Sequence, residues 1–210
     1  MGIIIMGETG SGKSTLGKML ASRTGFELYE IGHEVKKVFL ERVKIEFDSS
    51  LIGCDKDYLT TNQRLKYTDD IVEKYGNDYY VRRILEKHSN ENIIVVGVRS
   101  MAEINAVKNK IRFPFFVGLT CAEEEILRRF INRESEFMSL DEAKKVFNER
   151  KMREEKWGME DVLSQANLIL QTDYEKPFEL STAIMEKYNE FVRQQMELES
   201  KKIVHEDLLR

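Results

Sequence analysis

The chain of 210 residues has few cysteines and few prolines. Cys54 and Cys121 lie far apart and form no Cys-x-x-Cys pair, so neither a disulfide framework nor a zinc site is indicated. The only prolines, Pro114 and Pro177, fall beside predicted strand and helix edges, and no proline-rich linker divides the chain. We therefore expect one domain over residues 1–210.

An excess of positive charge is also lacking. The chain has 33 lysines and arginines against 37 aspartates and glutamates. This is too little positive charge for a surface built mainly around nucleic-acid phosphates, although net charge alone does not exclude a local basic cleft. The apolar residues 1–6 end at a glycine-rich loop and are far fewer than a signal peptide or a membrane span needs. We expect no nucleic-acid partner, no membrane association and a cytoplasmic location.

Short apolar runs bounded by turns are present instead, and each predicts a buried strand. They are Ile3–Met6, Phe26–Tyr29, Ile93–Val96, Phe113–Leu119 and Asn167–Leu170. Apolar residues at helical spacing lie between most of these runs. Because parallel neighbours need crossover connections, the alternation predicts an α/β fold: a parallel five-stranded sheet with helices on both faces.

Two segments interrupt this alternation. Residues 32–76 show helical patterns without a clear strand and are predicted to be an insertion, and a charge-dense helical segment covers about residues 134–158. From Glu179 onward, apolar residues recur at helical spacing. This last segment could dock back, contact a second copy or fray, and the sequence leaves open whether the protein is a monomer or a homodimer.

The most specific motif runs from Gly7 to Ser14 and satisfies G-x-x-x-x-G-K-[ST] between a predicted strand and a predicted helix. Glycines let backbone N–H groups curl around phosphates, Lys13 adds positive charge, and the hydroxyl of Ser14 can bind Mg²⁺. The residues expected to bind ATP are Gly7, Thr9, Gly10, Ser11, Gly12, Lys13, Ser14 and Thr15. The loop predicts nucleotide binding but does not separate kinases from GTPases, helicases or switches.

Beyond the loop, almost the full chain resembles the small P-loop kinases that include nucleoside monophosphate kinases and dephospho-coenzyme A kinase. Ile93–Ser100 is similar to the segment that delivers an arginine to the acceptor's phosphate in this superfamily. Phe147–Gly158 resembles the arginine-bearing lid of an uncharacterised dephospho-coenzyme A kinase-like branch. The resemblance implies a P-loop NTPase fold, with an acceptor-binding insertion at about 32–76 and a lid at about 134–158.

Arginines are the main candidate catalytic groups. Arg99 falls at the carboxyl end of a predicted parallel strand, where open sheets place ligands, unless it pairs with Glu103 four residues on. The pairs Arg129 with Arg133 and Arg150 with Arg153 each share a helix face and could close over a transferred phosphate, or could simply be solvated. The predicted catalytic residues are Lys13, Glu34, Arg99, Arg133, Arg150 and Arg153.

One departure from the family pattern concerns magnesium. The strand before the acceptor arginine commonly carries an aspartate in related kinases, and this chain has Val96 there. A second family acid aligns with His33, with Glu30 and Glu34 nearby, and we expect Glu34 to take that role. A first-turn glutamate that complements the helix dipole is the alternative.

These observations predict a Mg²⁺-dependent kinase that moves the γ-phosphoryl group of ATP to a small phosphorylated acceptor, a nucleoside monophosphate or nucleotide-like metabolite. Within the insertion, Lys36, Lys37 and Arg64 are candidate phosphate contacts that solvated faces explain equally well. The alternative is an ATP-dependent switch or ATPase without a small-molecule acceptor. A nucleic-acid ATPase or end kinase is a third class, for which a basic stripe is missing.

Overall fold

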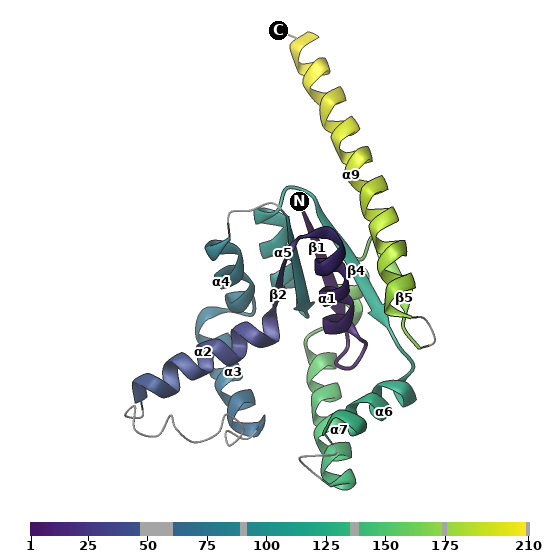
Figure 1. The fold of residues 1–210 in the computed structure, drawn as a ribbon. Coiled ribbons are helices and arrows are strands. Elements are labelled where there is room, and N and C mark those ends of the chain that lie inside the picture. The colour runs from purple at the N-terminus through teal and green to yellow at the C-terminus, as the bar shows by residue number, and fades with distance from the viewer. Residues whose placement is uncertain (47–60, 89–91, 135–138, 174–175, 209–210) are drawn as a thin grey trace.

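The computed structural model describes residues 1–46, 61–88, 92–134, 139–173 and 176–208 (Figure 1). Strands and helices alternate along most of the chain, as the apolar runs predict. The elements are β1 (Gly2–Gly7), α1 (Lys13–Thr24), β2 (Glu27–Glu30), α2 (Ile31–Glu46), α3 (Thr61–Tyr75), α4 (Tyr79–Lys87), β3 (Ile93–Val98), α5 (Met101–Lys110), β4 (Pro114–Thr120), α6 (Glu123–Glu134), α7 (Leu140–Lys156), α8 (Met159–Leu163), β5 (Leu168–Gln171) and α9 (Pro177–Leu208).

The five strands form one parallel sheet in the order β2-β3-β1-β4-β5. Every residue of the central strands β1 and β3 is buried, as expected for parallel strands that are covered on both faces. The predicted α/β fold with a parallel five-stranded sheet is therefore confirmed.

The core lies on both faces of the sheet because successive strand side chains point in opposite directions. Ile4 and Met6 of β1 belong to a cluster with buried residues of α4 and α5. Ile3 and Ile5 belong to the opposite cluster, which includes Leu16 and other residues of α1 and α9. This packing fixes α1 behind the end of β1, where the glycine-rich loop connects them.

Helices flank the carboxyl edge of the sheet on two sides (Figure 1). Within the predicted insertion lie α2 and α3, and no strand occurs in its described residues, 32–46 and 61–76. Within the predicted lid segment lies α7, which packs on α6. The functions of the insertion and lid stay predictions here, and Arg64 lies outside the described side chains.

The long helix α9 docks by its first half and then extends past the body of the protein (Figure 1). Leu180, Ile184 and Tyr188 are buried in the core cluster that covers the α1 face of the sheet. Farther along, the Glu199 carboxylate pairs with Arg112. Of the alternatives left open by the sequence, docking back is thus observed for this first half.

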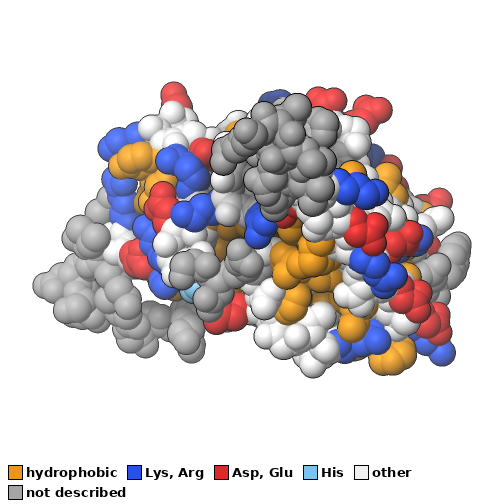
Figure 2. All heavy atoms as spheres, turned by 90° about the horizontal axis from the view of Figure 1, so that it is seen from above, with side chains coloured by type: hydrophobic (Ala, Val, Ile, Leu, Met, Phe, Trp, Pro, Cys, Tyr) orange, Lys and Arg blue, Asp and Glu red, His pale blue; other side chains and the backbone are white. Residues whose placement is uncertain are grey.

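Figure 2 shows acidic and basic side chains interspersed among the described residues of one face. No continuous basic stripe crosses this part of the surface. In the described part of the chain, every helix is too short or too polar to cross a bilayer. Cys121 is a free, half-buried thiol, and Cys54 lies outside the described residues.

Candidate active site

The glycine-rich loop curls between β1 and α1 through backbone angles that favour glycine. Gly7, Gly10 and Gly12 have φ values of 138°, 90° and 87°. A Cβ on Gly7 would lie 2.4 Å from the carbonyl oxygen of Leu119, so no larger residue fits there. Gly12 caps α1 without a side-chain hydrogen bond, which leaves the first N–H groups of this helix available to an anion.

Lys13 lies inside this curl. Its side chain is buried, and Nζ donates to the carbonyl oxygens of Gly7, at 2.8 Å, and of Glu8. The next residue, Ser14, is exposed at the start of α1 together with Thr15. The predicted phosphate-binding residues therefore lie together in the loop between β1 and α1 and in the first turn of α1.

Glu30, at the end of β2, is the acid that contacts Ser14. Ser14 Oγ donates to Glu30 Oε2 at 2.6 Å. In the parallel register, Glu30 lies directly beside Val96 of β3, the position where related kinases carry an aspartate. The neighbouring strand thus supplies a carboxylate at the same edge of the sheet.

Glu34 lies elsewhere. Its Oε1 accepts hydrogen bonds from Arg83 Nε at 2.8 Å and Lys87 Nζ at 2.7 Å, both on α4. Burial by itself would raise the pKa of Glu34, but the hydrogen bonds from Lys87 and Arg83 hold it below its ordinary value. The structure therefore ties Glu34 to α4, whereas Glu30 contacts Ser14, and the catalytic role of Glu34 stays a prediction.

Arg99 points to the phosphate loop. Its Nη2 donates to Thr9 Oγ1 at 3.4 Å, and Nη1 lies 3.6 Å from Glu154 Oε1. The sequence left open a side-chain pair between Arg99 and Glu103. In the structure, the Glu103 carboxylate instead accepts a hydrogen bond from the backbone N–H of Arg99. The guanidinium faces Thr9 of the loop and Glu154, and its contact with an acceptor phosphate stays a prediction.

A cavity of about 190 Å³ opens beside Arg99. Its walls come from α2, α3, α4, α5, the end of β3 and the residue that follows α7. They are Ile31, Gly32, Val35, Thr68, Val72, Asn77, Tyr80, Gly97, Arg99, Ser100, Glu103 and Trp157. Most of the surface that lines this cavity is apolar, and Arg99 supplies a positive charge. The predicted insertion therefore does form a wall of a cavity next to the loop.

Glu103 is the buried carboxyl group of this cavity. Its Oε2 accepts the backbone N–H groups of Arg99 at 2.7 Å and Ser100 at 3.0 Å, completing a capping box at the start of α5. Burial raises the pKa of Glu103 to about 7, against the lowering effect of these hydrogen bonds. From the sequence, Glu103 was expected only as a possible surface partner of Arg99.

The lid arginines face different neighbours. Arg150 places its guanidinium 5.0 Å from the Phe130 ring centre and lines a small cavity beside Thr9. Arg153 pairs with Asp69 of α3 at 3.0 Å, which joins the lid helix to the insertion. The Arg133 side chain lies outside the described residues, so its role stays a prediction.

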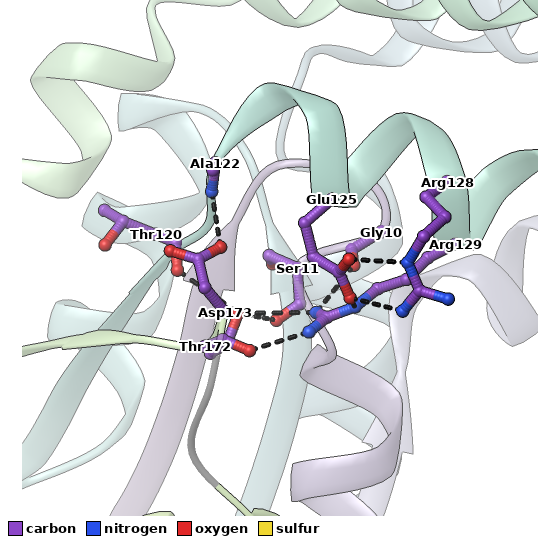
Figure 3. A network of polar contacts seen from close by, with 9 residues as sticks. All are labelled: Gly10, Ser11, Thr120, Ala122, Glu125, Arg128, Arg129, Thr172 and Asp173. Carbon is purple, nitrogen blue, oxygen red and sulfur yellow. Dashed lines mark hydrogen bonds and ion pairs between the residues drawn. The ribbon is translucent and has the colours of Figure 1, made fainter.

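Arg129 and Thr172 hold the outer side of the loop (Figure 3). Arg129 Nη2 donates to the carbonyl oxygen of Thr172 at 2.7 Å, and Nη1 to that of Gly10 at 3.4 Å. Thr172 Oγ1 donates to the carbonyl oxygen of Ser11 at 3.1 Å. The segment after β5 therefore borders the nucleotide loop, a neighbour that no local sequence pattern indicated.

Residues 3–156 of the chain match a protein family described as the AAA domain. The chain belongs to this family. It is also 30% identical over 202 residues to the cytidylate kinase of Thermoplasma volcanium, covering 93% of this chain and 95% of the relative. The cytidylate kinase of Thermoplasma acidophilum is 26% identical over 199 residues, covering 92% and 95%. This member of the family is a small P-loop kinase.

Solved structures agree on the fold of this P-loop kinase. A gluconokinase from Sinorhizobium meliloti matches with a TM-score of 0.53 and 16% identity, over 95% of this chain and 96% of that one. A shikimate kinase from Bacteroides thetaiotaomicron also matches with a TM-score of 0.53 and 16% identity, over 90% and 98%. These structures confirm the P-loop NTPase fold. The phosphotransferase activity is confirmed by the relatives named cytidylate kinase, and the ATP-dependent switch is not favoured.

Proposed function

We propose that this kinase transfers the γ-phosphoryl group of ATP to a nucleoside monophosphate, and that cytidylate is its preferred acceptor. The observation that carries the proposal is the position of Arg99, between the phosphate loop and the 190 Å³ cavity. A guanidinium fork suits an acceptor phosphate, and an aromatic and apolar cavity suits a nucleobase. Two relatives named cytidylate kinase support this class of acceptor.

The chemistry is mainly electrostatic, because phosphoryl transfer spreads negative charge over peripheral oxygens. Lys13 and the loop amides hold the donor phosphates, and Arg99 positions the acceptor. On the lid helix, Arg150 lines a small cavity beside Thr9, and Arg153 pairs with Asp69 of the insertion. We infer that closure of the lid brings these arginines onto the transferred group and excludes water.

The magnesium ion that ATP carries fits two oxygen donors at this loop. Ser14 Oγ and Glu30 Oε2 lie 2.6 Å apart, and Mg²⁺ prefers oxygen ligands, few of them from the protein and the rest from phosphates and water. When bound, the ion neutralises charge on the outer phosphates.

Glu30→Gln is expected to lower turnover about 100-fold at low Mg²⁺ and less at saturating Mg²⁺, because a carboxylate near the ion is lost. The measurement is turnover across a Mg²⁺ titration. Glu27→Gln, on the same strand and exposed, is the matched control. If Glu34→Gln shows the Mg²⁺ effect and Glu30→Gln does not, the acid assigned from the structure is wrong.

The acceptor proposal is tested with a panel of acceptors, ATP and Mg²⁺, with detection of the phosphorylated product. We expect CMP to be the best acceptor among CMP, UMP, AMP and dephospho-coenzyme A. The last compound is included because the resemblance of the lid segment to a dephospho-coenzyme A kinase-like branch stays a prediction. Phosphate release that needs no acceptor would contradict the proposal.

Glu103→Gln is expected to shift acceptor preference toward UMP, by about tenfold in the ratio of kcat/KM values for UMP and CMP. A carboxylate accepts a hydrogen bond from the amino group of cytosine but repels the uracil carbonyl oxygen, whereas glutamine can donate to that oxygen. Glutamine also preserves the capping box. The assay is run at pH 8, above the Glu103 pKa of about 7.

Thermal unfolding of Glu103→Gln serves as the control for the helix cap. If Glu103→Gln folds normally and its ratio of kcat/KM values for UMP and CMP equals that of wild type, Glu103 does not recognise the base.

A further inference from the structure

The carboxylate of Glu154, near the end of the lid helix α7, lies on the phosphate loop. It is almost fully buried. The backbone N–H of Thr9 points to both carboxylate oxygens, at 3.1 and 3.0 Å, and Thr9 Oγ1 donates to Oε1 at 2.5 Å. One lid carboxylate therefore takes up both hydrogen-bond donors that Thr9 offers.

The same carboxylate reaches the acceptor side. Glu154 Oε1 lies 3.6 Å from Arg99 Nη1, so one anion contacts both the donor loop and the arginine assigned to the acceptor. Loop N–H groups and arginine forks are the donors that proteins use for phosphoryl oxygens. Glu154 thus has the partners that a phosphoryl group in transfer would have.

We propose that Glu154 is a resident anion of the active site: in the nucleotide-free kinase its carboxylate occupies the place of the γ-phosphoryl group, and ATP must displace it. Two negative groups cannot share these donors, because repulsion at such short range is strong in a site shielded from water. After transfer the carboxylate returns and favours release of the product nucleotide. Glu154 is then a positioning residue that connects the state of the donor site to Arg99.

The surroundings of Glu154 agree with this role. Burial, followed by the neighbouring Glu154 carboxylate, raises the pKa of Glu8 in the same loop, so this part of the loop already holds crowded negative charge. Two further ion pairs of α7, Lys151 with Glu123 and Arg153 with Asp69, each include an exposed carboxylate. Exposed ion pairs of this kind contribute little to stability, so they do not prevent α7 from moving.

A movement of Glu154 would also displace a residue that lines the acceptor cavity. Trp157, directly after α7, lines that cavity and places its ring 5.8 Å from the guanidinium carbon of Arg99. It is the only tryptophan of the chain. Its emission therefore reports displacement of the lid end without any added label.

The test compares wild type, Glu154→Gln and Glu155→Gln, a control for net charge at the exposed neighbouring position. Calorimetry measures the Kd of a non-hydrolysable ATP analogue and of ADP, both with Mg²⁺, while Trp157 emission follows the lid. For Glu154→Gln we expect the Kd of the ATP analogue to fall about tenfold and that of ADP to fall less, since ADP lacks the γ-phosphoryl group. Glu155→Gln should match wild type.

The proposal is overturned if Glu154→Gln leaves the analogue's Kd unchanged or raises it, because the carboxylate then does not compete with phosphate. An equal gain in Glu155→Gln would also overturn it, since net charge alone would explain the result. Glu154→Ala provides a second variant in case the amide retains the Thr9 contacts, and the same fall in Kd is expected. These outcomes do not depend on the acceptor, so they stay separate from a failure of the cytidylate proposal.

Discussion

Lys13→Ala is expected to lower the turnover of ATP-dependent transfer by about a thousandfold, because the ammonium stabilises charge that develops on the transferred group. Lys13 Nζ lies inside the loop on the carbonyl oxygens of Gly7 and Glu8. The ammonium also neutralises the bound phosphates, so the KM for ATP should rise. Steady-state kinetics with the acceptor identified by the panel measure both effects.

Lys18→Ala is the matched control for this variant. Lys18 lies on the same helix α1, but its side chain is exposed. We expect its turnover to equal that of wild type. Because alanine at position 13 leaves two loop carbonyl groups without this donor, thermal unfolding must show that Lys13→Ala still folds. Normal turnover in a folded Lys13→Ala variant would refute the mechanism.

Arg99→Ala is expected to raise the KM for the acceptor about 100-fold, because one charged, two-pronged contact with a phosphate is worth about 3 kcal/mol. The KM for ATP should change less, since the hydrogen bond from Arg99 to Thr9 of the loop is long, at 3.4 Å. Initial rates with each substrate varied in turn give the two constants separately.

Arg99→Lys separates charge from geometry. Lysine keeps the positive charge but lacks the planar fork, so we expect it to restore only part of the acceptor affinity. Arg82→Ala, on an exposed arginine of α4, serves as the control for loss of one positive charge. Equal losses of affinity for ATP and acceptor in Arg99→Ala would show that the acceptor site lies elsewhere.

The fold could be predicted because its signals are local. Five apolar runs and the helical patterns between them were enough for the parallel sheet, since strands buried on both faces must be apolar throughout. The phosphate loop followed from glycines whose backbone angles other residues rarely adopt. Arg99 followed from its place at the end of a strand. The segment after β5, by contrast, borders the loop through Thr172, which no motif marked.

The sequence by itself therefore determined the sheet, the nucleotide loop and the placement of Arg99 at the carboxyl edge. Only the tertiary structure decided which acids meet them. Glu30 and Glu34 are four residues apart, and the register of β2 beside β3 brings Glu30 to Ser14 while packing of α2 on α4 takes Glu34 away. Glu154 reaches Thr9 across 145 positions of the chain. Contacts of this kind depend on how helices pack against a sheet, which short sequence patterns do not encode.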